Sequence, residues 1–92
     1  MPRTQSAQHV ALGDALRELR TQRGISQEEL AYRAGMHRNY VGACERGEIN
    51  LSFRVLLQFT EGLAVNLSEI VAHYERIQQV GEHSIPSEQR PD

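Results

Sequence analysis

Two short helical segments flank Gly35, and their spacing restricts the fold of this chain more than any other feature of its sequence. The first segment begins after Ser26, whose hydroxyl can cap a helix while Glu29, three residues later, reaches back to the cap. Gly35 ends this segment, because the position after a helix commonly takes a left-handed backbone that glycine adopts without strain. A second helix is predicted directly afterwards, over about residues 37–45.

These two helices meet the requirements of a helix-turn-helix unit, in which a short turn containing glycine joins two short helices. The first helix must carry a small residue where the helices cross, and Ala31 stands there. The turn contains Gly35, and the inward position of the second helix is Val41. The sequence therefore predicts a helix-turn-helix over about residues 26–46.

Three further helices are predicted from apolar residues that recur at helical spacing. One covers about residues 10–23, before the helix-turn-helix. Another begins after Ser52, and the last covers about residues 67–78. Asn66 and Glu69 repeat the capping pattern at the start of this last helix.

A chain of 92 residues has room for one apolar core and therefore for one domain. We expect an all-α, five-helix domain over residues 10–79. Flexible tails are expected at residues 1–9 and 80–92, because their polar, proline-containing sequences lack the apolar surface needed to order them.

The sequence also favours some classes of protein over others. No apolar run approaches the roughly 20 residues that cross a bilayer, and the N-terminus lacks the apolar stretch of a secretory signal. We therefore expect a cytoplasmic protein with no membrane partner. The four histidines and Cys44 are scattered, without zinc spacing or a glycine-rich phosphate loop. We expect no catalytic residue, no metal and no cofactor, and hence no enzyme.

The stretch QRGISQEELAYRAGMHRNYVGACERGEINLS resembles the XRE and lambda-repressor-like helix-turn-helix family. The resemblance continues through LLQFTEGLAVNLSEI, so it covers about residues 12–71. Within the family, ERGEINLSF is most similar to small controller proteins of restriction-modification systems. The resemblance implies a lambda-repressor-like fold and a sequence-specific regulator of transcription, such as a repressor, that binds a palindromic operator in double-stranded DNA as a homodimer.

The resemblance also places the helix that begins near His37 in the major groove of DNA, with its first turn pointing at the bases. Position by position, Arg38 and Asn39 are expected to contact base edges, and His37, Gly42 and Ala43 to line the same face. The chemistry agrees, because Arg can bind guanine O6 and N7 in bidentate fashion and Asn can bind adenine N6 and N7. Alternatively, Arg38 contacts only phosphate.

Further contacts are expected with the DNA backbone. Gln27 lies in the first turn after the Ser26 cap, where free N–H groups and the helix dipole attract an anion. In the family this position contacts phosphate, although an exposed helix-forming residue would look the same. Weaker candidates for backbone contacts are Tyr40, Asn50, Ser52 and Arg54.

Two features concern stability and affinity more than base recognition. The family positions that match Arg20 and Glu45 form an ion pair, which would tie the first helix to the end of the third. His37 stands where Ser or Thr is usual, and because imidazole is a poor N-cap the helix start is expected to be looser. Glu48 places an acid near the expected DNA backbone and should weaken phosphate binding locally.

The last predicted helix has more apolar residues than one small core requires, and an exposed apolar patch usually marks a partner surface. The residues expected at a homodimer interface are Leu67, Ile70, Val71, Tyr74 and Ile77. Alternatively, they complete the monomer core. A different function also stays open, that of an antitoxin-type interaction module that binds a protein partner as well as DNA.

Overall fold

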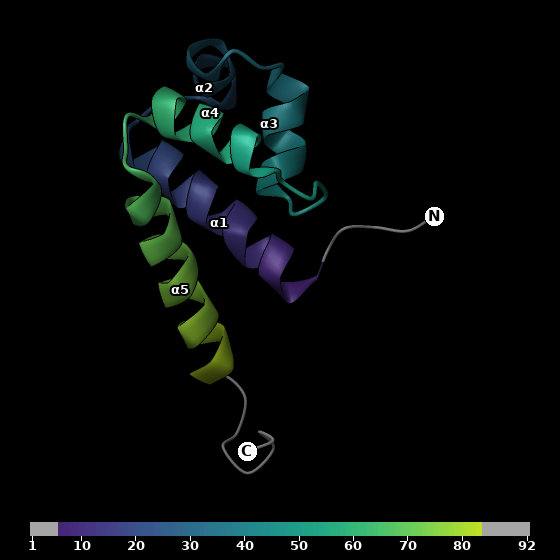
Figure 1. Ribbon diagram of the computed structural model, residues 1–92, viewed down its shortest axis with the longest axis vertical. Helices are drawn as coiled ribbons and strands as arrows, with labels where there is room; N and C mark the ends of the chain where they lie inside the picture. Colours follow the sequence, from purple (N-terminus) through teal and green to yellow (C-terminus); the bar gives the residue numbers. More distant parts are fainter. Residues whose placement is uncertain (1–5, 84–92) are drawn as a thin grey trace.

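The computed structural model describes residues 6–83, and side chains within residues 6–80. This part of the chain contains five helices and no strand (Figure 1). They are α1 (Ala7–Gln22), α2 (Gln27–Ala34), α3 (Arg38–Glu45), α4 (Phe53–Leu63) and α5 (Leu67–His83). The expected all-α, five-helix class is confirmed.

Serine residues form the N-caps of α1, α2 and α4. Ser6, Ser26 and Ser52 each accept a hydrogen bond from the backbone N–H three residues further on, at 3.2, 3.0 and 3.1 Å. The cap at Ser6 corrects the expected N-terminal tail, because α1 begins at Ala7 and residues 7–9 are helical. The other residues of that tail, 1–5, lie outside the described part of the chain.

At the other end of the domain, α5 continues to His83 and does not stop near Gln78. The expected tail over residues 80–92 therefore begins too early. A single glycine in a helix costs only about 1 kcal/mol, so Gly81 does not break it. The first proline of this region, Pro86, lies among residues 84–92, for which no structure is described.

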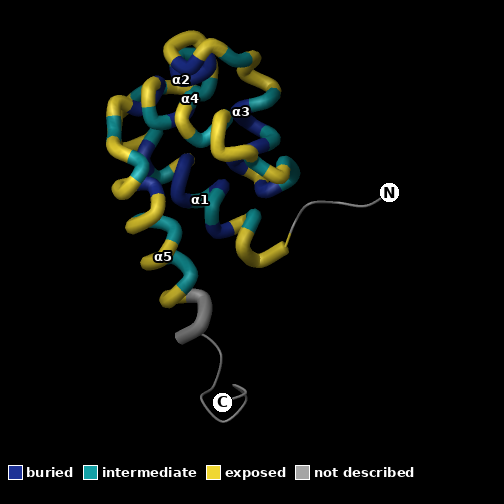
Figure 2. The backbone as a smooth tube through the Cα atoms, viewed as in Figure 1, coloured by how far each residue is buried: buried dark blue, intermediate teal, exposed yellow. Residues whose placement is uncertain are grey.

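The core lies where α1, α2, α3 and α4 meet, and α5 adds Ile70 to it. The two positions expected to pack inside the helix-turn-helix, Ala31 and Val41, are buried, and Gly35 has the expected positive φ of 71°. Figure 2 shows that the buried segments concentrate in these helices, whereas α5 is exposed or half-buried over most of its length. The buried apolar cluster consists of Leu16, Leu19, Leu30, Ala31, Ala34, Val41, Cys44, Phe59, Leu63 and Ile70.

Two glycines let neighbouring helices approach closely. A Cβ at Gly13 of α1 would lie 2.6 Å from the carbonyl oxygen of Cys44 in α3. A Cβ at Gly62 of α4 would lie 2.8 Å from the Cβ of Ala34 in α2. These crossings fix α3 against α1 and α2 against α4, so both helices of the helix-turn-helix are held by close packing.

Helix α1 packs against α3 on one side and α5 on another, and in Figure 1 it lies between them. Helix α2 packs against α3 and α4. Among residues 6–83, no single helix is long and apolar enough to cross a membrane, and α4 and α5 meet that test only as a pair bent by 103°.

Candidate nucleic-acid interface

An open, polar hollow of about 660 Å³ lies between the N-terminal turn of α2 and one face of α3. We call it the α2–α3 hollow. It brings together Gln27, Arg38, Asn39 and Gly42, all expected to contact DNA. Its full lining is Arg20, Ser26, Gln27, Glu28, Arg38, Asn39, Gly42 and Arg46.

Arg20, which lines this hollow, pairs with the buried Glu45. Arg20 Nε donates to Glu45 Oε2 at 2.6 Å and Nη2 donates to Oε1 at 3.1 Å, a bidentate pair. Arg20 Nη1 also donates to the carbonyl of Ile25 at 2.9 Å. The Glu45 side chain is only 2% exposed, so its charge depends on these partners. The pair joins α1 to the end of α3, and the Ile25 contact adds the segment before α2.

Gln27 belongs to the same network. Its amide nitrogen donates to Glu45 Oε1 at 2.8 Å. The side chain is therefore oriented by the buried carboxylate, where the sequence suggested either a phosphate contact or a plain exposed residue. Its Oε1 faces α3, 3.5 Å from where a Cβ on Gly42 would stand.

The start of α3 differs from the expectation for His37. Its Nδ1 accepts a hydrogen bond from the Asn39 N–H at 3.0 Å, so His37 caps the helix. The imidazole accepts from the N–H two residues further on, whereas the serine caps accept from the N–H three residues further on. His37 also lies outside the α2–α3 hollow, in a shallow hollow beside Tyr32 and Met36. It thus does not share one lining with Asn39 and Gly42.

Arg46 is a residue of this site that the sequence interpretation missed. It lies one helical turn after Gly42, and a Cβ added to Gly42 would stand 3.1 Å from Arg46 Nη1. The glycine leaves room for the guanidinium to fold over α3. Arg46 Nε donates to Glu48 Oε2 at 2.9 Å, and this hydrogen bond raises the pKa of Arg46. The i, i+4 relation to Gly42 was a signal that could have identified Arg46.

The other residues expected at the DNA surface are spread around this site. Tyr40 is half-buried against the core, and burial raises the pKa of its phenol. Ala43 is half-buried on α3. Ser52 caps α4, and Arg54 in the first turn of α4 is exposed. Asn50 borders a different pocket, where its Oδ1 lies 3.4 Å from His9 Nε2.

Comparison with known proteins assigns this arrangement to a family. Residues 11–73 match the family described as helix-turn-helix domain. The chain belongs to the helix-turn-helix family. The match includes both helices that line the hollow and most of the packing around them.

Two relatives are similar to this helix-turn-helix chain in sequence. It is 32% identical over 60 residues to the control protein C.SmaI of Serratia marcescens, covering 65% of this chain and 71% of that protein. It is 44% identical to the restriction-modification controller protein C.AhdI from Aeromonas hydrophila, whose crystal structure matches with a TM-score of 0.68 over 70% of this chain and 93% of that one. These likenesses confirm the expected resemblance to XRE-type proteins of the controller branch.

A third comparison concerns the fold alone. The wild-type restriction-modification controller protein C.Esp1396I is 24% identical, with a TM-score of 0.78 over 83% of this chain and 99% of that one. The helices of this helix-turn-helix chain are thus arranged as in controller proteins.

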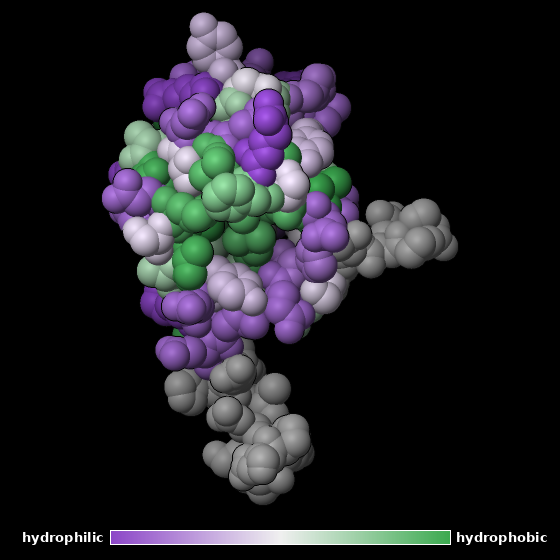
Figure 3. Space-filling model, viewed as in Figure 1, coloured by the Kyte–Doolittle hydropathy of each residue, from purple (hydrophilic) through white to green (hydrophobic). Residues whose placement is uncertain are grey.

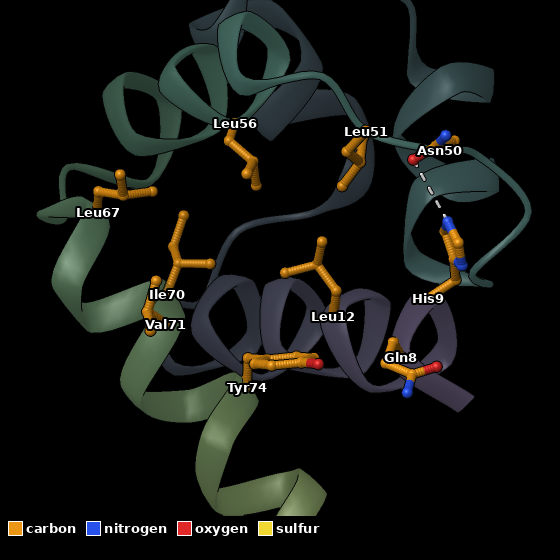
Figure 4. Close-up of a pocket in the computed structure, with 10 residues that line it drawn as sticks. All are labelled: Gln8, His9, Leu12, Asn50, Leu51, Leu56, Leu67, Ile70, Val71 and Tyr74. Carbon is orange, nitrogen blue, oxygen red and sulfur yellow. Dashed lines mark hydrogen bonds between the residues drawn. The ribbon is translucent and has the colours of Figure 1, made fainter. Parts of the chain in front are cut away.

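The helix-turn-helix chain has a second surface feature, an apolar groove of about 200 Å³ between α1, α5, the segment before α4 and α4 itself (Figure 4). We call it the α1–α5 groove. In Figure 4 the side chains of Leu12, Leu51 and Leu56 point into the same space as those of α5. Figure 3 shows apolar side chains gathered over α4 and α5 within a polar surround. The lining consists of Gln8, His9, Leu12, Asn50, Leu51, Leu56, Leu67, Ile70, Val71 and Tyr74.

The five residues expected at a dimer interface are divided by the structure. Leu67, Val71 and Tyr74 line the groove, and Val71 is 42% exposed. Ile70 also lines it but is only 1% exposed, so it belongs to the monomer core, as the alternative interpretation held for all five. Ile77 lies on a different side, in a hollow lined mainly by α1. Helical spacing alone did not separate these faces.

Cys44 is buried in the helix-turn-helix core, 1% exposed. Burial, followed by the nearby Glu45 charge, raises the pKa of its thiol to about 12. The thiolate needed for nucleophilic attack is therefore strongly disfavoured at neutral pH.

Proposed function

We propose that this helix-turn-helix protein regulates transcription by binding double-stranded DNA in a sequence-specific way. The observation that carries the proposal is the placement of Arg38 and Asn39, exposed side chains in the first turn of α3 beside the N-terminus of α2. The similar proteins named as control, controller and regulator proteins support it. The expected place of action is the cytoplasm, where bacterial operator DNA lies.

Helix α3 would enter the major groove with its first turn toward the bases. Arg38 would bind the O6 and N7 of a guanine, and Asn39 the N6 and N7 of an adenine, each worth about 1 to 3 kcal/mol of discrimination. Ala43, half-buried on the same helix, is small enough to let α3 approach the base edges closely. Gly42 is buried and instead makes room for the side chains of Gln27 and Arg46.

Contacts with the DNA backbone would surround this helix. Free N–H groups at the start of α2, next to Gln27, suit a phosphate. Arg46 and Arg54 add cations at the end of α3 and the start of α4. Tyr40, Asn50 and Ser52 carry hydroxyl or amide groups near these elements and complete the proposed backbone set.

We further propose that the protein acts as a homodimer through the α1–α5 groove. A second copy is the occupant that fits, because a two-fold axis pairs the same apolar patch with itself. Leu67, Val71 and Tyr74 would meet their counterparts, and Ile77 would lie at the edge. Two-fold symmetry would place the two α3 helices about 34 Å apart, so the operator would be a palindrome with half-sites one DNA turn apart.

Selection of bound sites from a pool of random duplexes tests this function. The expected product is one enriched inverted repeat. Arg38→Ala should relax the preference at one base pair of each half-site, whereas Arg33→Ala, which removes an exposed arginine paired with Glu29 outside the hollow, should not. Failure to enrich any sequence would overturn the proposal, and uniform weakening by Arg38→Ala would restrict Arg38 to phosphate.

A further inference from the structure

Arg38 already has an anionic neighbour on the surface where DNA is proposed to bind. Its Nη1 lies 3.6 Å from Oε1 of Glu28, and both side chains line the α2–α3 hollow. Both are mainly exposed, 63% for Arg38 and 75% for Glu28. The contact is made through one guanidinium nitrogen, and at 3.6 Å it is longer than a hydrogen bond. Arg38 can therefore stay beside Glu28 and still present donors to a second group.

The kind of second group matters, because Glu28 brings a negative charge. The O6 and N7 acceptors of guanine are neutral, so Glu28 does not repel them as ions. A phosphate on Arg38 would bring a second anion close to the Glu28 carboxylate, and like charges disfavour each other. The same carboxylate thus penalises a phosphate contact more than a base contact.

We propose that Glu28 is a specificity-determining residue, which directs Arg38 toward base edges by opposing its contact with phosphates. The inference rests on the proposed DNA-binding function and deepens it. It gives Glu28 a role beyond the favourable interaction of an acid with the helix dipole. Glu28 acts through Arg38, so it is a positioning residue and needs no contact with DNA itself.

The chain supplies a matched control in the next residue. Glu29 has the same charge and lies in the same first turn of α2. Its Oε2 pairs with Arg33 Nε at 2.8 Å, and it does not line the α2–α3 hollow. A comparison of Glu28→Gln with Glu29→Gln therefore separates the effect on Arg38 from a general gain of positive charge and from the helix dipole.

The experiment measures two dissociation constants for each variant at one salt concentration, one for a random-sequence duplex and one for the duplex returned by selection. Glu28→Gln is expected to tighten binding to the random duplex about three- to fivefold and to the selected duplex less than about twofold. Glu29→Gln should change both affinities by a similar, smaller factor. Circular dichroism of each variant verifies that the helices are retained.

A double-mutant cycle completes the test. In the Arg38→Ala background, Glu28→Gln should no longer alter the ratio of the two affinities. A ratio that is unchanged by Glu28→Gln in the parent, equally changed by Glu29→Gln, or still changed without Arg38 would overturn the proposal while leaving DNA binding intact. A parent protein that binds both duplexes with equal affinity, or neither, would overturn the proposed function as well.

Discussion

Gly13 of α1 lies directly against the backbone of Cys44 in α3, so close that a Cβ on the glycine would stand 2.6 Å from the Cys44 carbonyl oxygen. Because the obstacle is backbone, α3 itself would have to move to make room. Gly13 therefore sets the distance between the helix that reads DNA in our proposal and the helix that supports it.

Gly13→Ala is expected to destabilise the protein by about 1 to 3 kcal/mol, the usual cost of overpacking, despite the better helix propensity of alanine. Urea unfolding followed by circular dichroism measures the change. Gln22→Ala, at an exposed position at the end of α1, is the control and should be nearly neutral. Equal or greater stability of Gly13→Ala would show that α3 shifts without cost.

Glu45→Ala should lower stability strongly, because it leaves the Arg20 guanidinium partly buried without its bidentate partner. Removing one partner of a fully buried ion pair costs about 3 to 5 kcal/mol, and the 13% exposure of Arg20 favours the lower end. Asp14→Ala, which breaks the exposed pair with Arg17, should cost less than about 1 kcal/mol. Thermal unfolding compares the three proteins. Equal melting temperatures for the parent and Glu45→Ala would contradict the structural role of the pair.

His37→Ser should stabilise the start of α3, because serine is a better N-cap than imidazole, by about 0.5 to 1 kcal/mol. His37→Ala, which removes the Nδ1 acceptor for the Asn39 N–H, should instead lower stability. Thermal unfolding of both variants and the parent at one pH measures the differences. If alanine and histidine proved equally stable, the hydrogen bond to Asn39 would contribute nothing.

Cys44 should make stability depend on pH in alkaline solution. Its pKa is raised from 9.0 to about 12 in the folded state, so the unfolded thiol ionises first. The contribution of the protonated Cys44 thiol to the free energy of unfolding is therefore complete below about pH 9. It is lost as the pH rises toward 12, with a slope of at most about 1.4 kcal/mol per pH unit. Urea unfolding across this range measures the slope, which should be shallower for Cys44→Ala. Burial, followed by the charge of Cys44, also raises the pKa of Tyr40, so Tyr40→Phe is the companion variant.

Val71→Asp should prevent dimer formation, because it places a charge on the wall of the α1–α5 groove. Val80→Asp is its control, since Val80 is a more exposed valine on the same helix and does not line the groove. Sedimentation at micromolar concentration should give a dimer for the parent and for Val80→Asp, and a monomer for Val71→Asp. A parent that sediments as a monomer would contradict the proposed homodimer.

The local rules that predicted the helix-turn-helix apply because they concern backbone groups close in sequence. Gly35 takes its positive φ, and Ser26 caps α2 as expected. The glutamate half of that capping pattern is less regular, because the carboxylate of Glu29 pairs with Arg33. At the start of α5 the glutamate does take its expected part, because Glu69 accepts a hydrogen bond from the Asn66 N–H at 2.9 Å. A capping pattern thus locates a helix start without fixing how its side chains pair.

The candidate site was less accessible to sequence reasoning because it depends on contacts between distant residues. Gln27 turns toward Glu45 because the fold brings the start of α2 against the end of α3, which spacing along the chain does not report. Ile70 and Ile77 share helix α5 but face different neighbours, which only the packing of α5 on α1 decides. Arg46 became a site residue through the missing side chain of Gly42.

Helix α1 touches α3 on one side and α5 on another. In the proposed dimer, α1 thus lies between the dimer interface and the recognition helix α3 of each subunit. No flexible linker separates the two. The distance between the two α3 helices would consequently be fixed. An operator with one base pair inserted at its centre should therefore bind much more weakly, even with both half-sites intact.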